Sequence, residues 1–117
     1  VFAAAGLAWT VMRLRSRIGS LVVSRALAAA GWTLLAGVTL IAALGTVDFD
    51  AVFEWFHSLF FAPGTWQFAD DALLIRVFPL PFWTASGIAW GALVAFVGAG
   101  MLLAAHRIRF TAGNIGV

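Results

Sequence analysis

The sequence predicts an all-α integral membrane protein, and its composition and the placement of its charges support this prediction. Of the 117 residues, 63% are hydrophobic and only 10% are charged, with a mean hydropathy of +1.02. A soluble domain usually has charge on about a quarter of its residues, so this chain lacks the charge to cover a water-exposed surface. The charges are also segregated along the chain. The acidic residues are Asp48, Asp50, Glu54, Asp70 and Asp71.

Two uncharged stretches are long enough to cross a bilayer. They cover residues 26–47 and 77–105, and the second is expected to span over about 82–105, beyond its last proline. A helix needs about 20 apolar residues, at a rise of about 1.5 Å each, to cross a hydrocarbon core of roughly 30 Å. We therefore expect two complete transmembrane helices. Neither has a central ionisable residue that would indicate a proton or ion pathway.

The first twelve residues are equally apolar but too short to span, since a helix of this length measures about 18 Å. The chain starts with Val rather than Met, and we expect it to be the C-terminal part of a longer chain whose upstream residues complete this helix. A signal peptide is the alternative, but positive charge would then precede the apolar stretch. The expected organisation is one membrane domain over residues 1–117, with two complete spans and the end of a third.

The arginines predict the orientation of these spans. A cluster of four lies within residues 13–25, which we expect to form a short basic turn, and two more follow the last span. By the positive-inside rule, residues 13–25 and 106–117 face the cytoplasm. The segment over about 47–81 is then extracytoplasmic. A net charge of +2 is too small for a phosphate-binding surface of the kind that nucleic acids need, so no nucleic-acid partner is expected.

The outer segment, residues 47–81, is aromatic where a plain loop would be polar. Eight of the eleven phenylalanines and three of the six tryptophans lie between residues 47 and 83. This composition predicts a folded segment of short helices that lie in the membrane interface.

Two such interfacial helices are predicted within the outer segment. Asp50 is the expected N-cap of a helix over about 51–61. Asp70 is the expected N-cap of a second helix over 71–78, which Pro79 ends.

His57 is the one histidine of the outer segment, and Glu54 precedes it by three residues. On a helix, the carboxylate could orient the imidazole and stabilise its charge, an arrangement that suits general-base catalysis at neutral pH. A purely structural role is the alternative for such a pair. No metal site or other cofactor is predicted, because the chain has no cysteine and its two histidines are expected on opposite sides of the membrane.

Gly87 and Gly91 form a GxxxG step in the last apolar stretch. Small residues at this spacing let helix backbones approach closely in lipid. One such pair is also expected by chance in a chain with twelve glycines, so the packing role stays open.

Several motifs in order resemble a family of small bacterial integral membrane proteins over about residues 45–85. They are FHxxFF at Phe56-His57-Ser58-Leu59-Phe60-Phe61, WxF at Trp66-Gln67-Phe68, LIxxxP at Leu74-Ile75-Arg76-Val77-Phe78-Pro79, and Phe82-Trp83 before the last span. The characterised activity of this family is that of a lipoprotein intramolecular transacylase.

The resemblance implies an enzyme that moves an acyl chain from the glyceryl group to the α-amino group of a lipoprotein's N-terminal cysteine. His57 would be the catalytic base that takes a proton from the amine, with Glu54 beside it. The implied substrate-binding residues are Trp66, Phe61, Phe68 and Arg76. The implied partners are the lipoprotein N-terminus and membrane lipid, in a multi-pass protein of the bacterial cytoplasmic membrane.

The family also has four spans and a second functional histidine between its first two helices; the first span and that histidine are not expected within this sequence. A second hypothesis therefore stays open, a non-catalytic accessory subunit of a larger respiratory or photosynthetic membrane complex. Helices rich in Ala and Gly, and an aromatic surface that could dock membrane-protein partners, favour this alternative.

Overall fold

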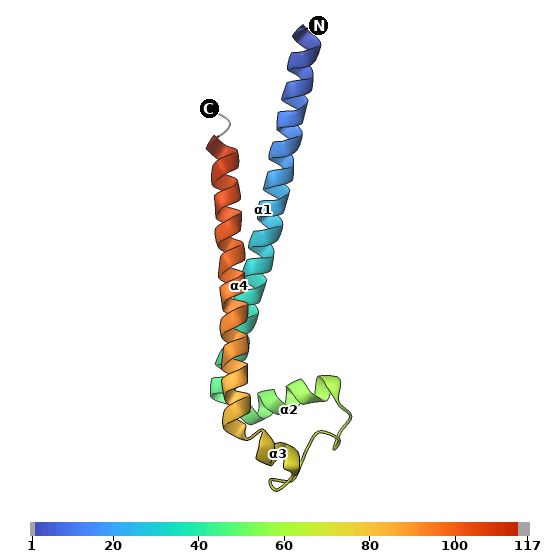
Figure 1. Cartoon of the computed structure of the whole chain (residues 1–117), viewed down its shortest axis with the longest axis vertical. Helices are drawn as coiled ribbons and strands as arrows, with labels where there is room; N and C mark the ends of the chain where they lie inside the picture. Colours follow the sequence, from blue (N-terminus) through green and yellow to red (C-terminus); the bar gives the residue numbers. More distant parts are fainter. Residues whose placement is uncertain (1, 115–117) are drawn as a thin grey trace. The chain divides into compact units, whose positions relative to one another are not determined.

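The computed structural model describes residues 2–114, and within them the chain is helical with no strand. Four helices follow one another in the sequence (Figure 1). They are α1 (Phe2–Val47), α2 (Phe49–Phe60), α3 (Leu73–Val77) and α4 (Leu80–Asn114). The chain divides into two compact units, which are described separately: unit 1 comprises residues 1–34 and 96–117, and unit 2 comprises residues 35–95.

Helices α1 and α4 are both long and apolar enough to cross a membrane, as judged by length and composition. They contain the stretches 26–47 and 82–105 that the hydropathy pattern predicts as spans. The all-helical prediction, with two helices of spanning length, is therefore confirmed.

The predicted basic turn at residues 13–25 is wrong, because α1 continues without a break through all of these residues. With 46 residues, α1 is about 69 Å long, so residues 1–12 do not belong to a separate helix. The physical reason is local. Arg and Leu are good helix formers, the stretch has no proline, and Gly19 is its one glycine. A charge cluster changes the solvation of a helix but does not end it.

In unit 1, α1 packs antiparallel to α4 through a seam of small residues. The buried residues of this seam are Ser24 and Gly31 on α1 and Gly98 and Ala105 on α4. A Cβ atom on Gly31 would lie 2.8 Å from the Gly98 carbonyl oxygen, closer than real Cβ contacts come. The absence of a side chain at Gly31 therefore sets the distance between the two helices.

In unit 2, the GxxxG step of α4 makes a looser contact than the sequence suggested. A Cβ atom on Gly91 would meet Val38 Cγ2 at 3.5 Å, an ordinary van der Waals distance, whereas one on Gly87 would meet no atom within 4 Å. Of the two glycines, only Gly91 therefore contacts α1 within the part of the chain that the structure describes.

The caps of the two short helices differ from the predicted ones. Asp48, not Asp50, caps α2, because its carboxylate accepts a hydrogen bond from the Ala51 N–H at 3.0 Å. Asp50 lies in the first turn, where the helix dipole favours a negative charge.

Helix α3 starts at Leu73 rather than Asp71, and its N-cap Ala72 has no side-chain cap bond. The Ala72 N–H donates to the Ala69 carbonyl at 2.9 Å, so Asp70 and Asp71 form a turn instead of a cap.

We expect Gly31→Ala to destabilise the protein although alanine is the better helix former. The added methyl group meets backbone atoms of α4, and overpacking of this kind costs about 1–3 kcal/mol. Gly37→Ala is the matched control on the same helix, since its Cβ atom would meet no atom within 4 Å. Thermal unfolding in detergent, followed by far-UV circular dichroism, measures both. Equal midpoints for the two variants would contradict the crossing at Gly31.

We expect Asp48→Ala to loosen the first turn of α2 by about 1 kcal/mol, the usual worth of an N-cap side chain. The readout is amide hydrogen exchange, which should become faster at Ala51. Asp70→Ala serves as the control, because Asp70 caps no helix and its loss should leave exchange in α3 unchanged. The cap assignment is wrong if Ala51 exchanges at the same rate in the wild type and in Asp48→Ala.

Candidate functional site

The candidate site is centred on His57, a half-buried residue in the second half of α2. Its Nδ1 atom lies 2.7 Å from the carbonyl oxygen of Phe53, four residues earlier on the same helix. A carbonyl oxygen can only accept a hydrogen bond, so Nδ1 is the nitrogen that carries the proton. In the neutral imidazole, Nε2 then has the free lone pair and is the basic atom.

Aromatic rings surround the His57 imidazole. The closest is Phe53, with ring centroids 4.2 Å apart, and Trp66 stacks on the imidazole at 4.6 Å with an interplanar angle of 24°. Phe56 and Phe61 complete the group at 5.5 and 6.0 Å. Because Phe53, His57 and Phe61 are four residues apart, α-helical geometry at the end of α2 brings them to one face.

A tight turn returns Trp66 to this face of α2. The turn follows Pro63 and uses Gly64 at φ 78°, a left-handed conformation that glycine adopts without steric cost. The Thr65 N–H donates to the Ala62 carbonyl at 3.2 Å, and its hydroxyl donates to the same oxygen at 2.6 Å. The Pro-Gly pair therefore positions the stacking partner of His57.

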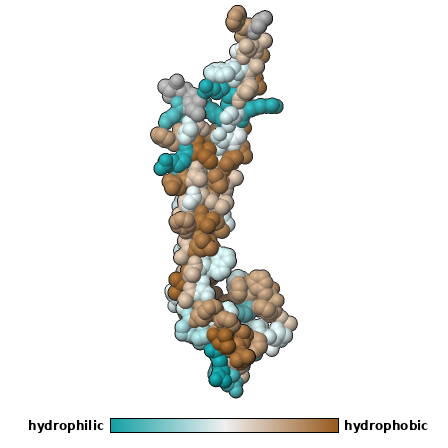
Figure 2. Space-filling view, viewed as in Figure 1, coloured by the Kyte–Doolittle hydropathy of each residue, from teal (hydrophilic) through white to brown (hydrophobic). Residues whose placement is uncertain are grey.

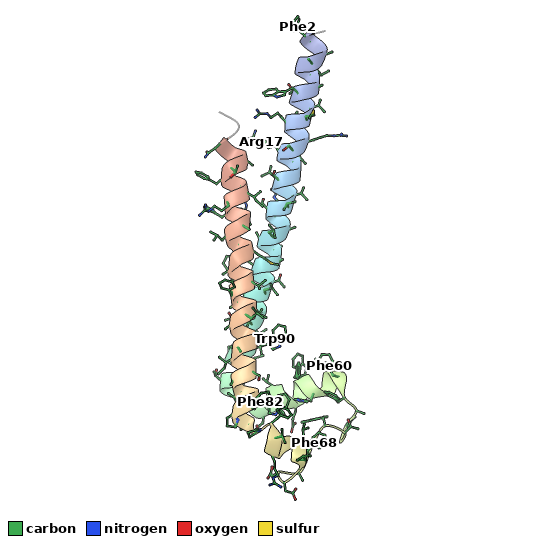
Figure 3. All side chains as sticks on the ribbon, viewed as in Figure 1. Phe2, Arg17, Phe60, Phe68, Phe82 and Trp90 are labelled. Carbon is green, nitrogen blue, oxygen red and sulfur yellow. The ribbon has the colours of Figure 1, made fainter. Side chains whose placement is uncertain are left out.

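The structure brings together three of the predicted site residues, His57, Trp66 and Phe61. Phe68 lies in the loop after α2 with half of its surface exposed, and Figure 3 shows it beyond Phe60, the last residue of α2. Arg76 lies in the last turn of α3 and is exposed. Within residues 2–114, no ring contact joins Phe68 to His57, and no hydrogen bond or ion pair joins Arg76 to it.

Glu54 does not orient the imidazole in this structure. The Nδ1 atom of His57 bonds to the carbonyl of Phe53 instead, and the Glu54 side chain is exposed. The positioning partner that sequence reasoning missed is thus a backbone atom. No sequence pattern signals this partner, because every helical residue has a carbonyl four residues before it.

A second aromatic cluster holds the junction between α3 and α4. The Trp83 Nε1–H donates to the Phe78 carbonyl at 2.8 Å. The Phe82 ring contacts those of Phe78 and Trp83 at centroid distances of 5.0 and 5.4 Å, and these two are 6.1 Å apart. The LIxxxP and Phe82-Trp83 motifs therefore form a structural corner in unit 2.

The side chains that contact one another in both clusters are aromatic. Figure 2 shows hydrophobic side chains gathered over the part of the molecule that contains α2 and α3, with a hydrophilic patch at its lower end. Among the described residues, no three His, Asp or Glu side chains lie close enough together to hold a metal ion. The chemistry that the site offers is therefore that of one imidazole in an aromatic setting.

Comparison with known protein families gives a match over most of the chain. Residues 1–83, which include His57 and Trp66, match the family described as "Lipoprotein intramolecular transacylase Lit". A protein of Aquifex aeolicus (strain VF5), described as uncharacterized, is 32% identical over 69 residues, or 56% of this chain. The chain spans about a third (32%) of the length of that relative. No solved structure matches the chain. The chain belongs to the lipoprotein intramolecular transacylase family.

Proposed function

We propose that this chain provides the general base of a membrane acyltransferase. The enzyme would move an acyl chain from the glyceryl group to the α-amino group of a lipoprotein's N-terminal cysteine. The observation that carries the proposal is the geometry of His57, whose Nδ1 atom is held by the Phe53 carbonyl at 2.7 Å, which leaves Nε2 as the base. Membership in the transacylase family supports the same reaction.

In the proposed reaction, Nε2 of His57 takes a proton from the amine nitrogen as that nitrogen attacks the ester carbonyl. A nitrogen–carbon bond forms, and collapse of the tetrahedral intermediate breaks the ester carbon–oxygen bond. The imidazolium then returns the proton to the departing glyceryl oxygen. The reaction as written consumes neither water nor a cofactor. Both reacting groups belong to one lipid-modified cysteine residue, which removes the entropy cost of bringing them together.

The aromatic neighbours suit the charged intermediate of this base. A cation over an aromatic face is stabilised by the ring quadrupole, and Trp66 stacks on the imidazole at 4.6 Å. Phe53 lies on it at 4.2 Å. The two rings therefore contact the imidazole on which the positive charge of the proposed step would form.

The apolar surroundings also suit the substrate, whose acyl chains stay in the bilayer. Helix α2 has an aromatic face and an acidic first turn, the pattern of a helix that lies in the membrane interface. We propose that residues 47–81 are extracytoplasmic in a bacterial cytoplasmic membrane, with residues 13–25 and 106–117 on the cytoplasmic side. Phe61 and Phe68 would contact the acyl chains, and Arg76 would bind the polar part of the substrate.

A non-catalytic accessory subunit is the second candidate. Large apolar side chains are exposed along both long helices, among them Trp32 at 64% and Phe96 at 78%, and such surfaces also fit helices of other membrane proteins. Two results together would favour this candidate. The wild-type protein would make no lyso-form lipoprotein, and native mass measurement after detergent extraction would find it in a stable complex with other proteins.

We expect His57→Gln to lower the yield of lyso-form lipoprotein by about 10²–10⁴-fold, the usual contribution of a general base. The full-length protein is expressed in a host with diacylglyceryl lipoproteins, and the N-terminal lipopeptides are identified by mass spectrometry. His106→Gln is the matched control, because it removes the other histidine of the chain, which belongs to unit 1 and to none of the contacts of His57. Activity that survives in His57→Gln would overturn the assignment of the base.

We expect Trp66→Leu to lower the turnover rate about tenfold through loss of the stacked aromatic face, and Trp66→Phe to recover most of that rate. Initial rates of lyso-form production, at equal amounts of protein with equal helical content, measure both variants. If Trp66→Phe is as slow as Trp66→Leu, the aromatic face of residue 66 does not assist the base.

A further inference from the structure

Unit 1 contains six arginines and not one acidic residue, whereas all five acidic residues of the chain fall in unit 2. The positive charge of unit 1 therefore has no carboxylate within the same unit to balance it. The arginines are Arg13, Arg15, Arg17, Arg25, Arg107 and Arg109.

Two of these arginines line an open cleft of about 610 Å³ in unit 1. Arg13 and Arg17 are four residues apart and so lie on one face of α1, where Trp9 precedes them by the same spacing. Ala112 contributes a small side chain from α4. The volume falls within the range of about 300–1,000 Å³ that is usual for ligand sites.

The donors of this cleft suit a phosphate group. The Arg13 guanidinium lies over the Trp9 ring at 4.4 Å, a contact that orients its planar fork. The Ser20 hydroxyl already donates to the Ser16 carbonyl at 2.9 Å, and the Thr10 hydroxyl to its own helix at 2.8 Å. Among the described residues that line the cleft, the guanidiniums, the Ser16 hydroxyl and the Trp9 indole N–H are the donors that remain. Guanidinium groups bind phosphate oxygens in pairs.

We propose that this cleft binds the headgroup phosphate of an anionic phospholipid. A lipid, rather than a free phosphate, fits because the surface around the cleft is apolar, with Leu14 and Ile18 exposed at 54% and 61%. Helix α1 then continues directly into the apolar stretch that begins at residue 26. This proposal does not depend on the proposed acyl transfer, which involves residues of unit 2.

The test is native mass spectrometry of the full-length protein in neutral detergent, with phosphatidylglycerol and phosphatidylcholine as probes. Because each arginine near an anionic lipid contributes about fivefold, Arg13→Gln with Arg17→Gln should weaken phosphatidylglycerol binding about thirtyfold. The matched control is Arg15→Gln with Arg25→Gln, which removes the same charge from residues that do not line the cleft. This pair should weaken binding less than the Arg13 and Arg17 pair does, because it removes the attraction of two charges but no contact of the cleft.

Equal weakening by the two pairs would overturn the site, because it would indicate attraction by overall charge alone. Equal binding of phosphatidylcholine, or full competition by soluble glycerol phosphate, would overturn recognition of an anionic lipid. If the glutamine pair loses helical content, Arg13→Lys with Arg17→Lys takes its place. It keeps the charge but loses the planar fork, and wild-type affinity in this variant would overturn the phosphate contact.

Discussion

An apolar environment leaves the polar groups of a helix few partners other than the helix's own carbonyls, and this constraint explains most of the side-chain hydrogen bonds in the chain. Thr33 donates to the carbonyl four residues earlier at 2.8 Å, and Thr84 does the same at 3.0 Å. Among the described residues, no buried side-chain polar atom lacks a partner. The bond from His57 to the Phe53 carbonyl is one more member of this set. The histidine thus acquires a defined tautomer through the same local geometry that satisfies the hydroxyls.

The same apolar setting explains why small residues matter in unit 1. Lipid tails are as apolar as leucine, so helices associate in a bilayer through close packing rather than through exclusion of water. Gly31 allows the approach of α4, and the buried Ser24 hydroxyl is satisfied by the Leu21 carbonyl at 2.9 Å. A polar side chain can therefore lie in this seam without a partner on the other helix.

Hydropathy was sufficient to predict the helical architecture, because long apolar stretches have one stable backbone conformation in lipid. It could not locate the ends of the helices. Residues 13–25 stay helical because good helix formers tolerate a charge cluster. Asp48 and Asp50 are both able to cap α2, and only the position at which the chain leaves α1 decides between them.

The candidate site was predictable in its residue types but not in its contacts. The motifs pointed to His57 and Trp66, and the structure stacks these two rings. The carboxylate of Glu54 was the expected partner of the imidazole, because side-chain patterns suggest side-chain partners. A backbone carbonyl is present at every residue, so its role at Phe53 depends on the wound helix rather than on the identity of that residue.

The Phe53–His57 hydrogen bond ties the chemistry of the imidazole to the winding of one helical turn. No side-chain substitution deletes the carbonyl, but unwinding of α2 between these residues would free the ring and exchange its two tautomers. A helix of 12 residues is marginal in water, so α2 depends on its contacts and on an interface to stay wound. The tautomer of His57 would then report whether this one turn of α2 is wound or open.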